Sequence, residues 1–152
     1  MKKAVVYSRV SSKEQDLTRQ IVQLRELAQN EDHQVVQFFY DIGSGKNAGA
    51  QRTGFSSFLE YASQNQVDTL FIDEISRLGR TAIDVQRNVD LLANQMKVNI
   101  YIRQQRMYLL DERGHYSPIS KIVVDVLANI AEAELEQLSA RIKSGMKQAM
   151  KK

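Results

Sequence analysis

The stretch DTLFIDEISRLGR, residues 68–80, joins an apolar run to a segment that carries two arginines. The run at 68–75 is typical of a strand in a parallel sheet, because strands covered on both faces lose the alternation of apolar and polar residues. Directly after it, Thr81 and Asp84 have the spacing of a capping box, which predicts that a helix begins there. The apolar face of that helix is formed by Val85, Val89, Leu92 and Met96.

The same alternation of strand and helix repeats on both sides of this stretch. Apolar runs predict further strands at 3–8, 34–40 and 98–104. Asp16 is suited to be the N-cap of the first intervening helix. The residues at helical spacing are Leu17, Ile21, Leu24 and Ala28 in one segment and Phe55, Phe58, Leu59 and Ala62 in the next. The predicted order is βαβαβαβ, with connections long enough for parallel pairing.

The C-terminal third predicts a short extended piece at 107–110 and then a long helix that starts near Pro118. Up to residue 130 this helix is apolar nearly all round, so we expect it to be buried on several sides. Its second half narrows to a stripe formed by Leu127, Ala131, Leu135, Leu138, Ile142 and Met146. The apolar side of residues 119–130 could pack either on the chain's own domain or on a partner helix. Beyond residue 130 the pattern favours packing on a partner helix from a second copy of the chain.

We therefore expect an α/β fold, with a mostly parallel sheet of four to five strands flanked by helices. The predicted organisation is an α/β core at 1–116 and a long helix at 117–152, whose apolar stripe favours dimerisation.

Composition excludes several classes of function. The chain of 152 residues has no cysteine, and its two histidines lie far apart, so we expect neither a disulfide nor a structural zinc site. The apolar runs are too short for a signal peptide or a membrane span, which predicts a cytoplasmic protein. The net charge of +3 is small, but the segment RIKSGMKQAMKK at 141–152 is basic throughout. Taken alone, such a run is most simply a solvated helix end.

Candidate functional residues follow the strands, because loops at the carboxyl ends of parallel strands converge on one crevice. The sequence has no glycine-rich phosphate loop of the dinucleotide or nucleotide-triphosphate type. What gathers at these strand ends is arginine and serine. A guanidinium stays charged and matches a phosphate bidentately, whereas a serine hydroxyl can act as a nucleophile. Taken singly, an arginine at such a place is more simply a surface charge, and a serine is more simply a turn residue. Together, however, the arginines suggest a phosphate site; they are Arg9, Arg52, Arg77 and Arg80.

Three separated motifs resemble those of the serine site-specific recombinases of the resolvase/invertase type. They are YSRVSSKEQDLTRQ at 7–20, DIGSGKNAGAQRTGF at 41–55 and ISRLGR at 75–80, and the resemblance extends over roughly 3–148. It implies that Ser11 is the nucleophile, that Gln15 and Gln20 orient the phosphate, and that Asp41 is an auxiliary acid. The arginines that it implies to be catalytic are the four named above.

The resemblance also has departures. Many relatives have Asp where this chain has Ser76, an auxiliary position, and the usual Glu-Arg step of the long helix reads Leu135, Glu136, Gln137. The small relatives carry a helix-turn-helix DNA-reading domain after this helix, and no such domain is expected within these residues. The resemblance implies that the long helix at 117–152 serves dimerisation and contact with the DNA backbone.

The resemblance implies a reaction and a set of partners. The reaction is DNA cleavage and rejoining through a covalent 5′-phosphoserine, with neither metal nor other cofactor. The partners are double-stranded DNA and further copies of the chain, as a homodimer and, in the active complex, a tetramer. The residues expected to contact the DNA backbone are Arg141, Lys143 and Lys147.

Three alternatives remain open from the residues. The first is a non-catalytic α/β oligomerisation or regulatory module whose arginines bind an anion. The second is a tyrosine-type recombinase or topoisomerase that uses Tyr7, Tyr108 or Tyr116, although the sequence lacks the His-x-x-Arg partner. The third is a catalytic domain that has lost activity, which Ser76 mildly favours.

Overall fold

The structure is a computed structural model that describes residues 1–10, 14–43 and 53–150. Strands and helices alternate as the sequence predicts. The elements are β1 (Lys2–Val10), α1 (Glu14–Asn30), β2 (His33–Ile42), α2 (Thr53–Gln64), β3 (Thr69–Ile72), the 3₁₀ turn η2 (Ile75–Leu78), α3 (Ala82–Asp90), the π-helical turn η3 (Leu91–Gln95), β4 (Asn99–Ile102), β5 (Met107–Tyr108) and α4 (Pro118–Met150).

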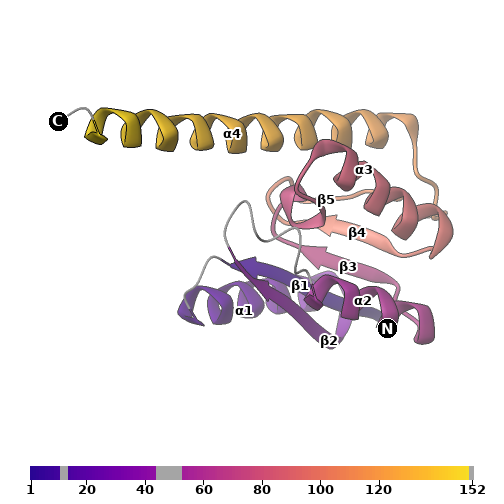
Figure 1. Cartoon of the computed structure of the whole chain (residues 1–152). Helices are drawn as coiled ribbons and strands as arrows, with labels where there is room; N and C mark the ends of the chain where they lie inside the picture. Colours follow the sequence, from indigo (N-terminus) through magenta and orange to yellow (C-terminus); the bar gives the residue numbers. More distant parts are fainter. Residues whose placement is uncertain (11–13, 44–52, 151–152) are drawn as a thin grey trace.

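The five strands form one sheet in the order β2-β1-β3-β4-β5. The first four are parallel, and β5 returns antiparallel beside β4. Figure 1 shows the helices on both sides of this sheet. The predicted α/β fold with a mostly parallel sheet of four to five strands is therefore confirmed.

Alternate residues of the central strands supply the two layers of the core, as the period of two in a strand requires. On one side Val6 and Phe71 pack against Leu24 and Ala28 of α1. On the other side Val5, Tyr7, Leu70 and Ile72 pack with residues of α2, α3 and α4. Because both faces of β1 and β3 are covered, the middle of β1 at 4–7 and the end of β3 at 70–72 are apolar without interruption.

Several predicted boundaries are wrong; the strand expected at 98–104, for example, ends at Ile102. The strand predicted at 68–75 ends at Ile72, because the chain bends at Asp73 and enters η2. Helix α1 begins at Glu14, so Asp16 is not the N-cap; it lies within the first turn and pairs with Arg19 at 3.4 Å. An acidic residue there is favourable because it faces the positive end of the helix dipole.

The helix after β3 begins where the capping box predicted. The side-chain oxygen of Thr81 accepts a hydrogen bond of 3.1 Å from the backbone N–H of Asp84. The α-helical part ends at Asp90, and the chain continues as η3, which still places Leu92 in the core.

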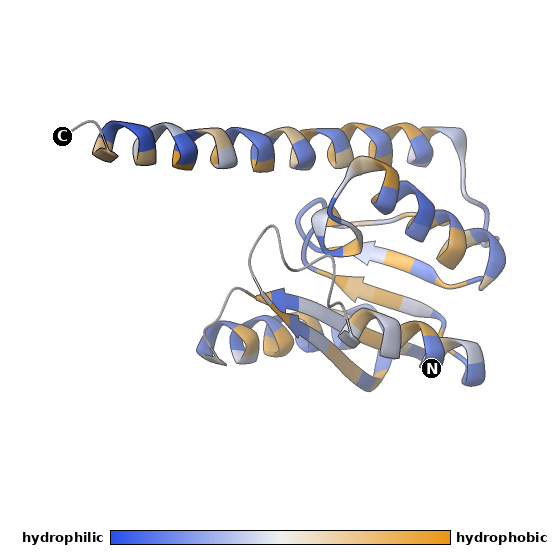
Figure 2. Cartoon of the chain, in the orientation of Figure 1, coloured by the Kyte–Doolittle hydropathy of each residue, from blue (hydrophilic) through white to orange (hydrophobic). Residues whose placement is uncertain are grey.

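Helix α4 has 33 residues and lies along α3 and η2 before its C-terminal part extends past the body of the domain (Figure 1). In the described part of the chain, Val124 and Ala128 are its buried residues. Ile119 is 75% exposed and Ile122 is 61% exposed, so the expectation that the first half is buried on several sides is wrong for the single chain. A straight helix on the flank of a sheet domain contacts that domain along one side. Figure 2 shows that apolar residues nevertheless occur along its whole length.

None of the helices in the described ranges is long and apolar enough to cross a membrane.

Candidate functional site: an arginine-lined groove at the sheet edge

The sheet order creates a crevice at the carboxyl end of β1. The chain leaves β1 toward β2 on one side, and β3 lies on the other side, so the connections diverge there. The registered pairing of β1 with β3 ends at Val6 and Phe71, whereas β1 continues to Val10. The end of β1 therefore runs past the last residue of β3 and reaches the turn η2. This geometry brings Arg9 to the same edge as Arg77.

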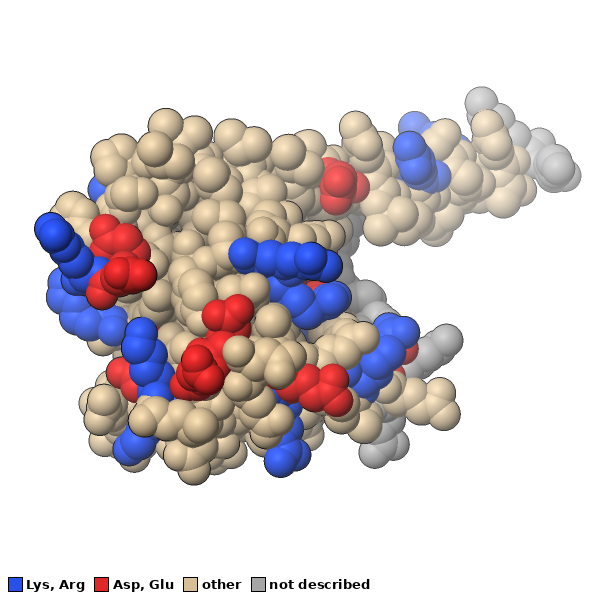
Figure 3. Space-filling model, turned by 180° about the vertical axis from the view of Figure 1, so that it is seen from behind, with Lys and Arg blue, Asp and Glu red and all other residues tan. Residues whose placement is uncertain are grey.

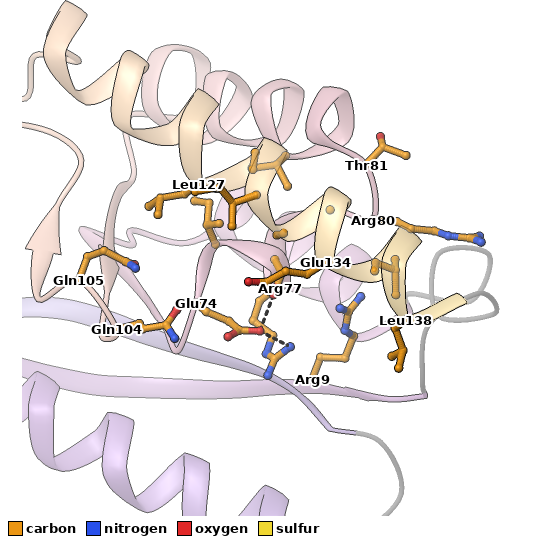
Figure 4. Close-up of a pocket in the computed structure, with 18 residues that line it drawn as sticks. Arg9, Glu74, Arg77, Arg80, Thr81, Gln104, Gln105, Leu127, Glu134 and Leu138 are labelled. Carbon is orange, nitrogen blue, oxygen red and sulfur yellow. Dashed lines mark hydrogen bonds and ion pairs between the residues drawn. The ribbon is translucent and has the colours of Figure 1, made fainter. Parts of the chain in front are cut away.

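A groove with a volume of about 530 Å³ lies between this edge and α4. Arg9, Ser76, Arg77 and Arg80 line it from the sheet side. Figure 4 shows the side chains of Arg9 and Arg77 reaching into the groove, whereas Arg80 extends away from them. The opposite wall is α4, which contributes mainly apolar side chains, among them Leu127, Leu135 and Leu138. Three of the four predicted arginines are thus brought to one site.

Glu74 joins two of the predicted residues to each other. Its Oε1 atom accepts a hydrogen bond of 2.6 Å from the hydroxyl of Ser76 and lies 3.2 Å from Nη1 of Arg77. Both interactions are drawn in Figure 4. The side chain of Glu74 is 33% exposed and that of Arg77 is 17% exposed, so this ion pair is screened by solvent less than a surface pair is. A carboxylate is therefore present beside Ser76, supplied from two residues earlier in the chain.

The backbone around Gly79 holds η2 against the start of α3. A Cβ atom at Gly79 would lie 2.5 Å from the backbone nitrogen of Val85 and 2.8 Å from the carbonyl carbon of Asp84, so a side chain has no room there. The side-chain amide of Asn88 also donates a hydrogen bond to the carbonyl of Leu78. Arg77 and Arg80 are thereby fixed near the N-terminus of α3, where two cations are unfavourable unless an anion is bound.

Asp41 lies apart from this groove and has a packing environment of its own. It is buried at the end of β2, where Oδ2 accepts hydrogen bonds from the hydroxyl of Tyr7 at 2.6 Å and from the backbone N–H of Phe55 at 3.1 Å. Oδ1 accepts from the backbone N–H of Gly54 at 2.8 Å. Asp41 thus joins the end of β2 to the first turn of α2.

The remaining predicted residues divide into two groups. Gln15 is exposed in the first turn of α1, and Gln20 is half-buried further along it; neither lines the groove. The Oε1 atom of Gln20 is buried without a hydrogen-bond partner among the described residues. Ser11 and Arg52 lie outside the described residues.

The predicted DNA-contacting residues lie on the part of α4 that extends past the body. Arg141, Lys143 and Lys147 are all exposed there. Figure 3 views the molecule from behind and shows basic and acidic side chains interspersed over the body, with basic side chains on the projecting end of α4.

Sequence reasoning missed four polar residues of the groove, namely Glu74, Gln104, Gln105 and Glu134. Glu74 could have been found, because it lies in the same strand-end segment as Ser76 and Arg77 and is the acidic residue nearest to both. The two glutamines follow β4, whose carboxyl end lies at the same edge of the sheet.

None of the three tyrosines considered as nucleophiles is suited to that role. Tyr7 is completely buried and donates its proton to Asp41. Burial raises the pKa of Tyr116 to about 12. Burial, together with the hydrogen bond to Glu31, also raises the pKa of Tyr108 above its ordinary value. A raised pKa disfavours the phenolate that would attack a phosphate.

Fold and groove together define an α/β domain with an arginine-lined site at the switch point of its sheet. The family model of the resolvase N-terminal domain matches residues 4–152. The C-terminal catalytic domain of ISC1926 TnpA, an IS607-like serine recombinase, is 32% identical with a TM-score of 0.55, over 66% of this chain and 70% of that chain. A comparison with curated proteins finds no match.

Two further solved structures share the fold. The N-terminal catalytic domain of TP901-1 integrase has a TM-score of 0.62 at 21% identity, over 90% of this chain and 98% of that chain. A resolvase family site-specific recombinase from Streptococcus pneumoniae has a TM-score of 0.65 at 22% identity, over the full length of both chains.

The chain belongs to the resolvase N-terminal domain family, and it is a serine recombinase catalytic domain. Its function is accordingly site-specific DNA recombination, and the alternative of a non-catalytic module is not favoured. DNA binding and oligomeric assembly follow from membership of the family.

Proposed function

We propose that Ser11 cleaves DNA by attack on a backbone phosphate. The bond between its Oγ atom and phosphorus forms while the bond to the 3′ oxygen breaks, which leaves a 5′-phosphoserine and a free 3′-hydroxyl. Ser11 loses its proton, and the departing 3′ oxygen gains one. Because one phosphate ester replaces another, reversal of the same step with a new 3′-hydroxyl rejoins the strand without an external energy source.

The observation that carries this proposal is the presence of Arg9 and Arg77 in one groove at the end of β1. Ser11 is the residue that follows β1 directly in the sequence, two positions after Arg9. Guanidinium groups held in place before the substrate arrives stabilise the negative charge that builds up on a phosphate during attack. We assign this role to Arg9, Arg77 and Arg80, and also to Arg52 of the segment before α2.

The other predicted residues receive supporting roles. Gln15 and Gln20 of α1 orient the phosphate, and Ser76 supports the arginines. Asp41 accepts three hydrogen bonds from Tyr7 and the first turn of α2. Its proposed part is therefore to hold α2, whose first residue directly follows Arg52 in the sequence, rather than to transfer a proton itself.

Helix α4 supports assembly into a homodimer and, in the active complex, a tetramer. At 100° per residue, Leu138, Ile142 and Met146 continue the side of α4 that faces its own domain, but they are 54%, 56% and 61% exposed. A second stripe, formed by Ile119, Ile122 and Val126, lies on the other side of the helix and is also exposed. Two separate apolar surfaces on one helix suit two different contacts between copies.

The two parts of the chain, the α/β core and the long helix, have different functions. Residues 1–116 form the catalytic core, and residues 117–152 form the arm for dimerisation and DNA contact. Arg141, Lys143 and Lys147 neutralise phosphates of double-stranded DNA along this arm. Because the substrate is DNA, we place the protein in the cytoplasm.

The test is covalent capture on DNA. The full gene product is incubated with supercoiled plasmids that carry the genomic DNA around its gene, denatured and digested, and any peptide that stays bound to DNA is identified by mass spectrometry. The unmodified protein is expected to give an adduct at Ser11, and Ser11→Ala is expected to give none. Ser12→Ala is the matched control and should keep the adduct. An adduct that persists in Ser11→Ala would contradict the proposal.

A further inference from the structure

We propose that Glu74 is a positioning residue that holds Arg77 in the groove for the scissile phosphate. This inference rests on the proposed function, because it concerns the same groove and the same reaction. It gives a role to a carboxylate that no motif of the sequence had indicated.

The geometry shows how Glu74 acts through its neighbour. Its Oε1 atom lies 3.2 Å from Nη1 of Arg77, so the ion pair holds one end of the guanidinium. The same oxygen also accepts the hydroxyl proton of Ser76 at 2.6 Å. One carboxylate oxygen therefore ties two side chains of η2 together, and the rotation of the long Arg77 side chain is restricted before DNA arrives.

Charge gives a second reason for a carboxylate at this point. Arg9, Arg77 and Arg80 all line the groove, and like charges at short range repel each other. An acidic partner offsets part of this repulsion in the absence of DNA. When a phosphate occupies the groove, a guanidinium that is already oriented loses less conformational freedom on binding than a mobile one.

Position 76 is a second place from which a carboxylate could reach Arg77. Here the Ser76 hydroxyl lies within hydrogen-bond distance of the oxygen that pairs with Arg77. A carboxylate at 76 would occupy nearly the same place. An acid at position 76 could therefore replace Glu74 as the partner of Arg77.

The experiment removes the carboxylate at position 74 and then restores one at position 76. Glu74→Gln keeps the size of the side chain and removes its charge, and it is expected to slow formation of the Ser11 adduct by about 100-fold, the effect of a small misplacement of a reacting group. DNA affinity, measured by gel shift, should not change. In the double variant Glu74→Gln/Ser76→Asp, the rate of adduct formation is expected to return toward that of the unmodified protein.

Asp73→Asn is the matched control, because it removes the same charge from the adjacent residue. Asp73 pairs with Arg103, and neither of them lines the groove, so adduct formation should be unaffected. Circular dichroism verifies that each variant is folded. A Glu74→Gln protein that reacts at the normal rate overturns the inference, as does a double variant without rescue. Failure of the unmodified protein to form any adduct would instead count against the proposed function.

Discussion

The hydroxyl of Tyr7 and the carboxylate of Asp41 form a buried hydrogen bond of 2.6 Å that joins the two neighbouring strands β1 and β2. The same carboxylate accepts the backbone N–H groups of Gly54 and Phe55. Asp41, which resembles an auxiliary acid by its motif, thus holds three elements together. The start of α2 depends on this contact for its position.

Removal of the Tyr7 hydroxyl is therefore expected to destabilise the domain. Tyr7→Phe leaves a buried carboxylate oxygen with one partner fewer, which should lower the free energy of unfolding by about 1.5–3 kcal/mol. Urea denaturation followed by circular dichroism measures this. Ser63→Ala removes an exposed hydrogen bond at the end of α2 and serves as control, with an expected change within about 0.5 kcal/mol. Equal midpoints for Tyr7→Phe and the unmodified protein would argue against the role of Asp41.

Gly79 is expected to tolerate no side chain. Gly79→Ala places a methyl group against the backbone of Asp84 and Val85, and the resulting displacement of α3 should cost about 1–3 kcal/mol of stability. It should also slow DNA cleavage, because Arg77 and Arg80 lie on either side of this position. Gly145→Ala is the control: a Cβ there meets nothing within 4 Å, so the helix should gain about 0.5–1 kcal/mol. Thermal unfolding of both variants tests the contrast.

The exposed stripe of α4 formed by Leu138, Ile142 and Met146 is expected to form the dimer contact. Ile142 lies on the same side of α4 as the buried Val124, so a second copy that covers Ile142 would continue the hydrophobic core of the domain along the helix. Ile142→Glu removes about 1.5–3 kcal/mol of burial per chain, which should raise the dimer dissociation constant by at least about tenfold. Sedimentation equilibrium measures the change. Ser144→Glu adds the same charge on the opposite side of the helix and should leave dimerisation intact; equal effects of the two substitutions would contradict this assignment.

The basic end of α4 is expected to bind phosphates without reading sequence. Replacement of Arg141, Lys143 and Lys147 by alanine should weaken binding to any duplex and reduce the slope of log K against log salt concentration by about 0.9 for each lost contact. Fluorescence anisotropy over a range of salt concentrations gives this slope. Arg25→Ala removes an exposed charge from α1 and should leave it unchanged. A slope that stays constant in the triple variant would remove these residues from the DNA interface.

Much of the fold could be predicted because it depends on local patterns. The uninterrupted apolar run of β3 and the Thr81 capping box both appear in the structure. The boundaries that were wrong depend on competition between neighbouring conformations. Asp16 suits a cap, but the helix starts earlier. After Ile72 the chain bends at Asp73 and Glu74 and then forms a 3₁₀ turn instead of extending the strand.

The sequence by itself determined the βαβ order, the arginines at the strand ends and the family motifs, since these follow from residue type and spacing along the chain. Only the tertiary structure decided that β1 extends beyond the end of β3, which places Arg9 at the same groove as Arg77. It also decided that Glu74 pairs with Arg77 and that α4 forms the opposite wall of the groove. Strand register and helix docking are set by packing between residues distant in sequence, and no local pattern contains that information.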